Sequence, residues 1–205
     1  IVWDFGRVTI RSILIYRVKR VDVYTLSGIY QLKNMKIHDD LLNESDFANL
    51  KNYILGSNFP WYKGYIVDQN HKMLCDPLDN IQFYCWLYYA HRPQTAEYKI
   101  VEPIVYHPEL KIASIIRVKA NMNLRTNKVI EHGYHTDGKF QCKTAIYYLN
   151  TNDGYTAFED GTQVESIENR LVVFDSQTKH TGSTCTNDQY RCVINFNYFT
   201  EEYGA

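Results

Sequence analysis

Beyond Lys111 the chain consists of short runs rich in apolar, β-branched and aromatic residues, separated by turn residues. Such runs are typical of β-strands, and Asn152-Asp153-Gly154 and Glu159-Asp160-Gly161 are typical turns. Eight short strands of this kind suit a double-sheet jelly roll. The pattern predicts these strands at 111–120, 134–137, 142–149, 155–158, 162–167, 170–175, 178–183 and 190–199.

The pattern before this region changes to that of a helix between Asn43 and Gly56. Asn43 can cap the first turn, Phe47, Leu50 and Ile54 fall on one face, and Gly56 suits the end of the helix. We therefore expect an amphipathic helix that packs its apolar face on the sheet.

Two further elements are predicted between this helix and the strand region. The continuous apolar and aromatic run Ile81–Tyr89 predicts a buried strand. A second helix is expected from Thr95 to about Tyr106, although Pro103 argues against regular helix through its centre. The fold class is thus mainly β with flanking helices (α+β), with N-terminal helices that buttress a jelly-roll core at about 111–200.

Composition supports one catalytic domain, which we assign to 35–205. The chain has 205 residues, 45% of them hydrophobic and 22% charged, which are ordinary globular values. Its 18 tyrosines and 9 phenylalanines favour a β-rich fold. The formal net charge of −1 gives no general reason to expect nucleic acid or an anionic membrane as a partner.

The cysteines and the hydropathy indicate the compartment. The 5 cysteines are odd in number and form no C-x-x-C pair, so neither a disulfide framework nor a zinc finger is indicated. No apolar run is long enough to span a membrane, and Asp4, Arg7 and Arg11 interrupt the first apolar stretch. We expect a soluble protein of the cytoplasm.

Residues 1–34 differ from the rest of the chain in charge. They contain 6 basic and 2 acidic residues, a local charge of +4, so the remaining residues of a chain of net charge −1 carry −5. One interpretation is a basic β-rich arm, because Val8, Ile10, Ile13 and Ile15 favour strand. The other is an extension translated from upstream of a natural start at Met35. Both interpretations stay open.

Candidate chemistry is concentrated between His135 and Arg191. In a strand, side chains two apart point to the same side, so His135 and Asp137 could share one metal ion. A third ligand could come from His180, which precedes another run of strand formers. Two imidazoles and one carboxylate on one face of an octahedral ion are the ligand set of non-haem Fe(II) oxygenases.

Several motifs around these residues resemble the 2-oxoglutarate- and Fe(II)-dependent dioxygenases. Ile146-Tyr147-Tyr148-Leu149-Asn150 and Arg170-Leu171-Val172-Val173-Phe174 resemble two strands of the prolyl 4-hydroxylase-like branch. Glu131–Asp137 and Phe158–Gly161 are similar to motifs of small oxygenases of marine phages and bacteria. The resemblance covers roughly residues 111–200.

This resemblance implies a set of site residues and cofactors. Iron would be held by His135, Asp137 and His180, and 2-oxoglutarate and O2 would be cosubstrates, with ascorbate as a further candidate. Arg191 lies 11 positions after His180 and would bind the distal carboxylate of 2-oxoglutarate, since guanidinium offers a fork of donors. Tyr148 would donate its hydroxyl to the same carboxylate, and Tyr147 would point to the opposite face.

The resemblance also implies the reaction. We expect hydroxylation of an aliphatic carbon, a peptidyl proline or similar, with release of succinate and CO2, in a bacterial or phage-infected cell. The substrate would be a peptide, a protein or a small molecule, with no nucleic acid and no membrane involved. The nucleic-acid demethylases of the superfamily have a second arginine where this chain has Asn197.

Alternatives to this reaction are a non-catalytic jelly-roll binding module, a demethylase of the same superfamily, and a cupin-type enzyme that uses its metal as a Lewis acid. Asp175, 5 positions before His180, either supports that histidine or ends its strand.

Overall fold

The computed structural model describes 35–66, 76–138 and 141–201, and the backbone of three short strands before them. These strands are β1 (Tyr16–Val18), β2 (Val21–Val23) and β3 (Ile29–Leu32). The other residues of 1–34 lie outside the described residues, as do the positions Val8, Ile10, Ile13 and Ile15 on which the predicted arm depended.

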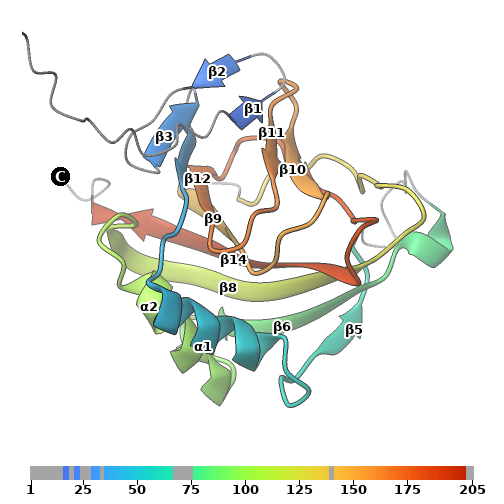
Figure 1. The fold of residues 1–205 in the computed structure, drawn as a ribbon. Helices are drawn as coiled ribbons and strands as arrows, with labels where there is room; N and C mark the ends of the chain where they lie inside the picture. The colour runs from blue at the N-terminus through green and yellow to red at the C-terminus, as the bar shows by residue number, and fades with distance from the viewer. Residues whose placement is uncertain are drawn as a thin grey trace, which may run out of the picture.

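Two antiparallel sheets face each other and form the core (Figure 1). The larger sheet has the order β3-β4-β12-β9-β14-β8-β6-β5, with β7 paired to β6, and the smaller one has the order β11-β10-β13. This arrangement confirms the predicted mainly β jelly roll. Strand bounds in the larger sheet are β4 (Met35–His38), β5 (Tyr62–Gly64), β6 (Gln82–Tyr89), β7 (Arg92–Pro93), β8 (Ile112–Leu124), β9 (Lys143–Tyr148), β12 (Leu171–Asp175) and β14 (Tyr190–Thr200), and in the smaller sheet β10 (Tyr155–Phe158), β11 (Gln163–Glu165) and β13 (His180–Gly182).

Side chains of the larger sheet separate by alternation into an apolar outer face and a mixed inner face. On β14, Cys192, Ile194, Phe196 and Tyr198 belong to the cluster that packs on the helices. The residues between them point toward the smaller sheet, where a second apolar cluster joins both sheets. Figure 1 shows the helices below the larger sheet and the smaller sheet above it.

The helices follow the predicted signals. Helix α1 (Glu44–Ile54) begins after Asn43, whose side chain accepts a hydrogen bond from Asp46 N, and it buries Leu50 and Ile54. A Cβ at Gly56 would lie 2.8 Å from Asn52 O, so the glycine allows the chain to pass close to the end of the helix. At 11 residues α1 is the longest helix in the described part of the chain, far short of the roughly 20 residues that a membrane span needs.

The second predicted helix divides just before Pro103, the residue that its sequence indicated as an interruption. A 3₁₀ segment, η2 (Ala96–Val101), is followed by α2 (Glu102–Val105), with the proline in its first turn. Another 3₁₀ turn, η1 (Pro77–Asp79), precedes β6.

Two strand predictions need correction. Residues 134–137 form no strand, because the only ladder contact there is an isolated bridge between His135 and His180. Strand β8 continues to Leu124, four residues beyond its predicted end, since Asn121 and Asn123 face the interior of the barrel and not solvent.

Asn169 joins the segment before α1 to the larger sheet. Its Oδ1 accepts hydrogen bonds from Leu42 N (3.0 Å) and Tyr147 Oη (2.7 Å), and its Nδ2 donates to Leu42 O (2.8 Å). Its φ of 60° lies in the left-handed region, where asparagine is among the better tolerated residues.

We expect Asn169→Ala to lower the free energy of unfolding by about 2–4 kcal/mol, because buried groups of Leu42 and Tyr147 lose their partners. Chemical denaturation measures this change. Asn52→Ala, at an exposed position of α1, is the matched control and should change stability by no more than about 0.5 kcal/mol. Equal effects of the two substitutions would show that Asn169 does not hold the two segments together.

Candidate metal and cosubstrate site

His135, Asp137 and His180 converge at the end of the smaller sheet. Within the described part of the chain they are the one group of three side chains that could hold a metal ion, and their ligand atoms lie within 4.8 Å of one another. Backbone hydrogen bonds set this position: His135 and His180 exchange two N–H···O=C bonds of 2.9 Å, and Asp137 N donates to Ser176 O at 2.9 Å. A single bridge thus brings His180 of β13 beside His135 and Asp137, which lie 45 and 43 positions earlier in the chain.

Asp137 is held by side chains from three strands of the larger sheet. Arg117 Nη2 donates to Oδ1 (2.6 Å), while Thr144 Oγ1 (2.9 Å) and Asn197 Nδ2 (3.2 Å) donate to Oδ2. Arg117 Nε also donates to Asn197 Oδ1, and Asn197 Nδ2 to Thr144 Oγ1. These hydrogen bonds fix the orientation of the carboxylate, and the side chain of Asp137 is buried, with 3% of it exposed.

The charges around Asp137 keep it ionised. Burial acts to raise the pKa of this carboxyl, but His180, Arg117 and His135 together with the Asn197 hydrogen bond outweigh burial, and the pKa is lowered. An ionised carboxylate is the form that binds a metal ion.

His180 is prepared to bind through one nitrogen. Its Nδ1 lies 2.9 Å from Thr178 O, which favours a proton on Nδ1 and leaves Nε2 free, at 3.8 Å from Asp137 Oδ2. Burial lowers the pKa of His180 and so favours neutral imidazole. Phe174 packs edge-on against the ring at 4.8 Å, which restricts its rotation.

Asp175 acts on His180 through the turn between them. Asp175 Oδ1 accepts a hydrogen bond from Gln177 N, and Asp175 O accepts one from Thr178 N. These bonds position Thr178, whose carbonyl faces the histidine. Asp175 therefore ends its strand and shapes the turn.

These three residues fit a divalent ion in donor type and placement. Bonds of about 2.1 Å to nitrogen and oxygen allow ligand atoms up to about 4.2 Å apart around one ion. The three ligand atoms lie within 4.8 Å of one another, so a small movement of one ring brings all of them into range of one ion. The Nε2 atoms of His135 and His180 each lie 3.8 Å from an oxygen of Asp137. His135 has a side chain that is 56% exposed, so it is free to adjust its ring while the buried pair stays in place.

Arg191 lies at the other end of the same cavity and is 3% exposed. Its Nε donates to Ser166 Oγ (2.7 Å) and its Nη2 to Thr156 Oγ1 (3.0 Å). In the part of the chain that the structure describes, no carboxylate pairs with this guanidinium. A buried charge without a counter-ion is costly, so the site suits an anionic ligand.

Two glycines provide the space that Arg191 occupies. A Cβ at Gly154 would lie 2.7 Å from Cδ of Arg191, and a Cβ at Gly182 would lie 3.3 Å from its Nη1. Both glycines belong to the region of the smaller sheet, so the arginine extends from β14 across the barrel toward it.

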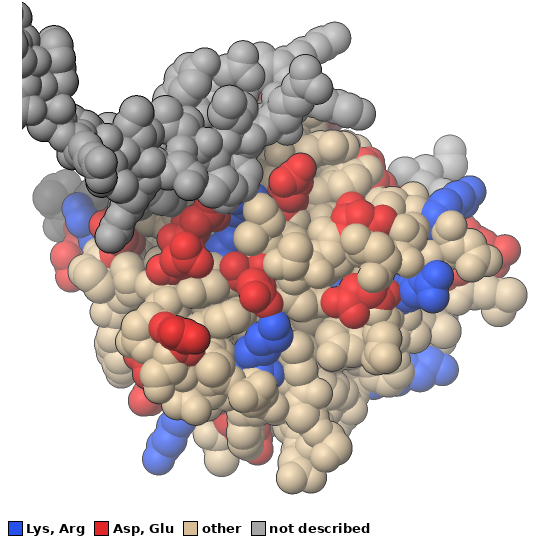
Figure 2. Space-filling model, viewed as in Figure 1, with Lys and Arg blue, Asp and Glu red and all other residues tan. Residues whose placement is uncertain are grey.

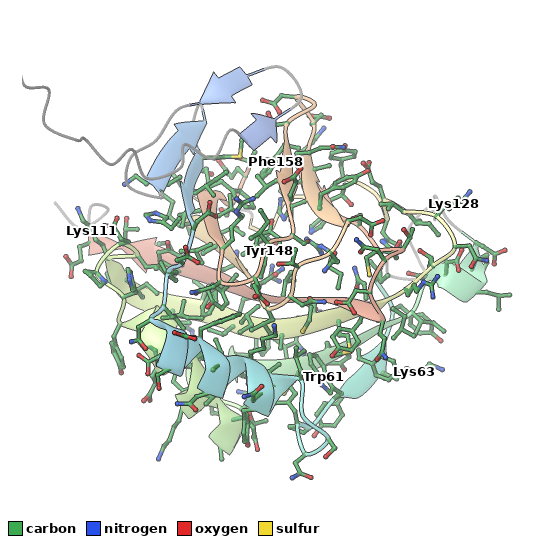
Figure 3. All side chains as sticks on the ribbon, viewed as in Figure 1. Trp61, Lys63, Lys111, Lys128, Tyr148 and Phe158 are labelled. Carbon is green, nitrogen blue, oxygen red and sulfur yellow. The ribbon has the colours of Figure 1, made fainter. Side chains whose placement is uncertain are left out.

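Tyr148 lies beside this arginine and does not line the cavity. Its ring centroid is 5.5 Å from Cζ of Arg191, and its hydroxyl donates to Thr156 Oγ1 at 2.8 Å. Figure 3 shows Tyr148 in the interior between the sheets, with Phe158 above it. Tyr147 lies in the opposite apolar cluster, as alternation predicted. The role of Tyr148 in binding a cosubstrate stays a prediction.

The cavity between the two ends has a volume of about 250 Å³ and a polar floor. Side-chain oxygens of Asn121, Asn123 and Asn195 are buried there without a hydrogen-bond partner. Sequence reasoning missed Arg117, Lys119 and Thr144. Alternation along β8 and β9 places these three side chains on one face of each strand. The sequence does not show that this face lines the site, because that depends on which strands pair.

The comparisons with known proteins agree with this architecture. The sequence matches no protein-family model and no curated protein. Among solved structures, a prolyl hydroxylase from Trichoplax adhaerens in complex with a peptide fragment of hypoxia inducible factor is similar at 16% identity, over 82% of this chain and 84% of that one, with a TM-score of 0.55.

Two further structures have comparable similarity. A 2OG-Fe(II) oxygenase family oxidoreductase from Burkholderia pseudomallei has 13% identity, 81% and 85% coverage, and a TM-score of 0.57. The non-heme alpha ketoglutarate dependent epimerase SnoN has 12% identity, 82% and 78% coverage, and a TM-score of 0.58.

We expect Asn197→Ala to weaken binding of Mn(II) or Fe(II) by roughly 10- to 100-fold, because groups that orient a metal ligand have effects of this size. Anaerobic calorimetry measures the dissociation constant. Asn195→Ala is the matched control, since it alters the same face of β14 without a contact to Asp137, and should bind as the parent does. Asp137→Ala should lose binding. A parent-like affinity in Asn197→Ala would remove the orienting role from Asn197.

The arrangement of two antiparallel sheets, with helices on the outer face of the larger one, is the fold of the prolyl hydroxylases and 2OG-Fe(II) oxygenases to which this chain is similar.

Proposed function

We propose that the protein is a 2-oxoglutarate-dependent Fe(II) dioxygenase that hydroxylates an aliphatic carbon, a peptidyl proline or a similar group. The observation that carries the proposal is that a group of possible metal ligands and a buried arginine lie at opposite ends of one cavity. His135, Asp137 and His180 form one end, and the buried Arg191, without a carboxylate partner among the described residues, lies at the other.

In this proposal each residue of the cavity has a defined task. When bound, iron and 2-oxoglutarate supply the oxidation, in which 2-oxoglutarate and O2 are converted to succinate and CO2 and one oxygen atom passes to the substrate. His135, Asp137 and His180 would hold the metal, and Arg117 donates a hydrogen bond that orients the carboxylate of Asp137. Arg191 would bind the distal carboxylate through its planar fork of donors.

A non-catalytic binding module is the first alternative. A protein that no longer catalyses a reaction at a metal ion does not need an ionised and oriented carboxylate, yet three side chains orient Asp137 here. A Lewis-acid enzyme is the second alternative. Such an enzyme needs no cosubstrate carboxylate, so it does not explain why Arg191 is buried without a carboxylate partner among the described residues. The dioxygenase accounts for both features.

A nucleic-acid demethylase is the third alternative. Asn197 stands where those enzymes have an arginine, and its side chain is engaged with Asp137 and Thr144. On the face shown in Figure 2, acidic side chains are spread over the surface, and basic ones lie between them without a continuous patch. Phosphate binding would favour a basic excess.

The peptide substrate and the compartment are also parts of the proposal. A prolyl hydroxylase in complex with a peptide fragment is among the similar structures, which supports a peptide. The described cysteines, Cys85, Cys142, Cys185 and Cys192, are free and buried, which fits the reducing cytoplasm of a bacterial or phage-infected cell.

We expect Arg191→Ala to raise the dissociation constant of 2-oxoglutarate by roughly 10- to 100-fold, because a charge-assisted hydrogen-bond pair is lost. Binding is measured without O2 on the Mn(II)-loaded protein. Arg125→Ala, at an exposed arginine directly after β8, is the matched control and should leave the constant unchanged. An unchanged constant in Arg191→Ala would place the carboxylate elsewhere.

The substrate class is tested by direct comparison. Proline-containing peptides and methylated single-stranded DNA are presented to the Fe(II)-loaded protein with 2-oxoglutarate, and succinate, formaldehyde and peptide mass are measured. We expect succinate together with the addition of one oxygen atom to a peptide. Formaldehyde release from DNA without peptide hydroxylation would assign the protein to the demethylases.

A further inference from the structure

Three cationic side chains and one carboxylate line the cavity. Arg117 is paired with Asp137 at 2.6 Å, and Arg191 lies at the far end, beside Thr156 and Ser166. The third cation, the ammonium of Lys119, makes no ion pair or hydrogen bond among the residues that the structure describes, and Asp137, whose charge acts on it, is already paired with Arg117. The cavity therefore holds one more positive charge than the metal and cosubstrate ends account for.

Lys119 is held between two aromatic rings on the inner face of the larger sheet. Its Nζ lies 5.0 Å from the ring centroid of Tyr84 and 5.2 Å from that of Trp86. Burial, and then the charge of Arg117, lower the pKa of Lys119 to about 8, so the ammonium still outnumbers the amine at neutral pH. Cation–π contacts offset part of the lost hydration, but they leave the donors of the ammonium free.

The position of Lys119 on β8 separates it from the proposed cosubstrate end. Two residues away, Arg117 contacts the carboxylate of Asp137, whereas Asn123, which pairs with Arg191, is four residues away in the other direction. At about 3.3 Å per residue these separations are about 7 Å and 13 Å along the strand. Lys119 is thus closer to the reacting end of the cavity than to the arginine.

An aromatic surface continues from Lys119 toward solvent. Ring centroids of Tyr62 and Tyr84 are 6.2 Å apart, and those of Trp86 and Tyr89 are 5.1 Å apart. Tyr62 on β5 and Tyr89, the last residue of β6, remain 55% and 52% exposed. Such rings offer contact area to the apolar body of a ligand whose charged group lies at Lys119.

We propose that Lys119 binds a carboxylate of the substrate, so that the substrate class is a carboxylate-bearing molecule with the reacting carbon close to the negative group. This inference rests on the proposed function and deepens it. The carboxylate has two sources, the terminal carboxylate of a small molecule and an acidic side chain next to the reacting residue of a peptide. An ion pair with a half-buried ammonium favours either source over its neutral amide.

The experiment compares substrate probes that differ only in this group. The pairs are N-acetyl-proline with N-acetyl-prolinamide, and end-blocked proline peptides with an adjacent Asp with the same peptides with Asn. Dissociation constants are measured by calorimetry on the protein loaded with Mn(II) and 2-oxoglutarate without O2, so that no turnover occurs. We expect the carboxylate member of at least one pair to bind 10- to 100-fold more tightly, and the pair that shows the preference identifies the source.

Variants of Lys119 then assign the preference. Lys119→Met keeps the length of the side chain and should abolish the preference, whereas Lys119→Arg should retain part of it. Lys128→Met, at an exposed lysine, is the matched control and should keep the preference of the parent protein. Equal binding within every probe pair, or a preference that survives in Lys119→Met, would overturn the proposal.

One further measurement separates this proposal from the proposed function. The dissociation constants of Mn(II) and 2-oxoglutarate should be the same in Lys119→Met as in the parent protein. Weaker 2-oxoglutarate binding in this variant would make Lys119 a cosubstrate ligand and would contradict the inference. A parent protein that binds no 2-oxoglutarate would contradict the proposed function, and the same probe pairs on the Mn(II)-loaded protein would still test Lys119.

Discussion

The alternation of side chains along β14 and β8 is the constraint on which the rest of the structure depends. From Val118 to Met122 on β8 and from Cys192 to Tyr198 on β14, every second residue belongs to the apolar cluster that includes residues of α1 and α2, and this packing fixes which residues face the smaller sheet. Because a shift of one residue would exchange the two faces, the apolar contacts of Cys192, Ile194 and Phe196 also hold Arg191 and Asn197 in the interior. The position of the polar residues is thus a consequence of the burial of their neighbours.

This constraint concentrates charge in a place where water is scarce. Asp137 meets Arg117, and the network with Thr144 and Asn197 satisfies both of its oxygens. Arg191 has hydroxyl partners but no carboxylate in the described part of the chain, and its burial lowers its pKa. Since a partner that binds only the folded protein stabilises it by mass action, an anion at Arg191 would compensate for the desolvation that the fold imposes.

Local sequence signals were sufficient to predict most helices and strands, but they did not predict which of these elements contact one another. Asn43 and Pro103 act on their own segments, so the start of α1 and the division of the second helix were predictable. The bridge between His135 and His180 joins residues 45 positions apart, and local periodicity at 134–137 suggested a strand in its place. Arg117 and Lys119 escaped notice because their roles depend on the pairing of β8 with β6 and β14.

The similar structures include two named for different chemistry, a prolyl hydroxylase and an epimerase. A fold shared at such low identity therefore does not select a substrate. Selection has to come from residues that the barrel does not require for its own stability, and these lie where the larger sheet extends through β6 and β5 to its edge. Tyr62, Tyr84 and Trp86 with Lys119 occupy that region, joined by contacts among themselves and not by the apolar core. The proposed carboxylate site would thus select the substrate from β6 and β8, where Lys119 pairs with Trp86 and with Asn195 of β14.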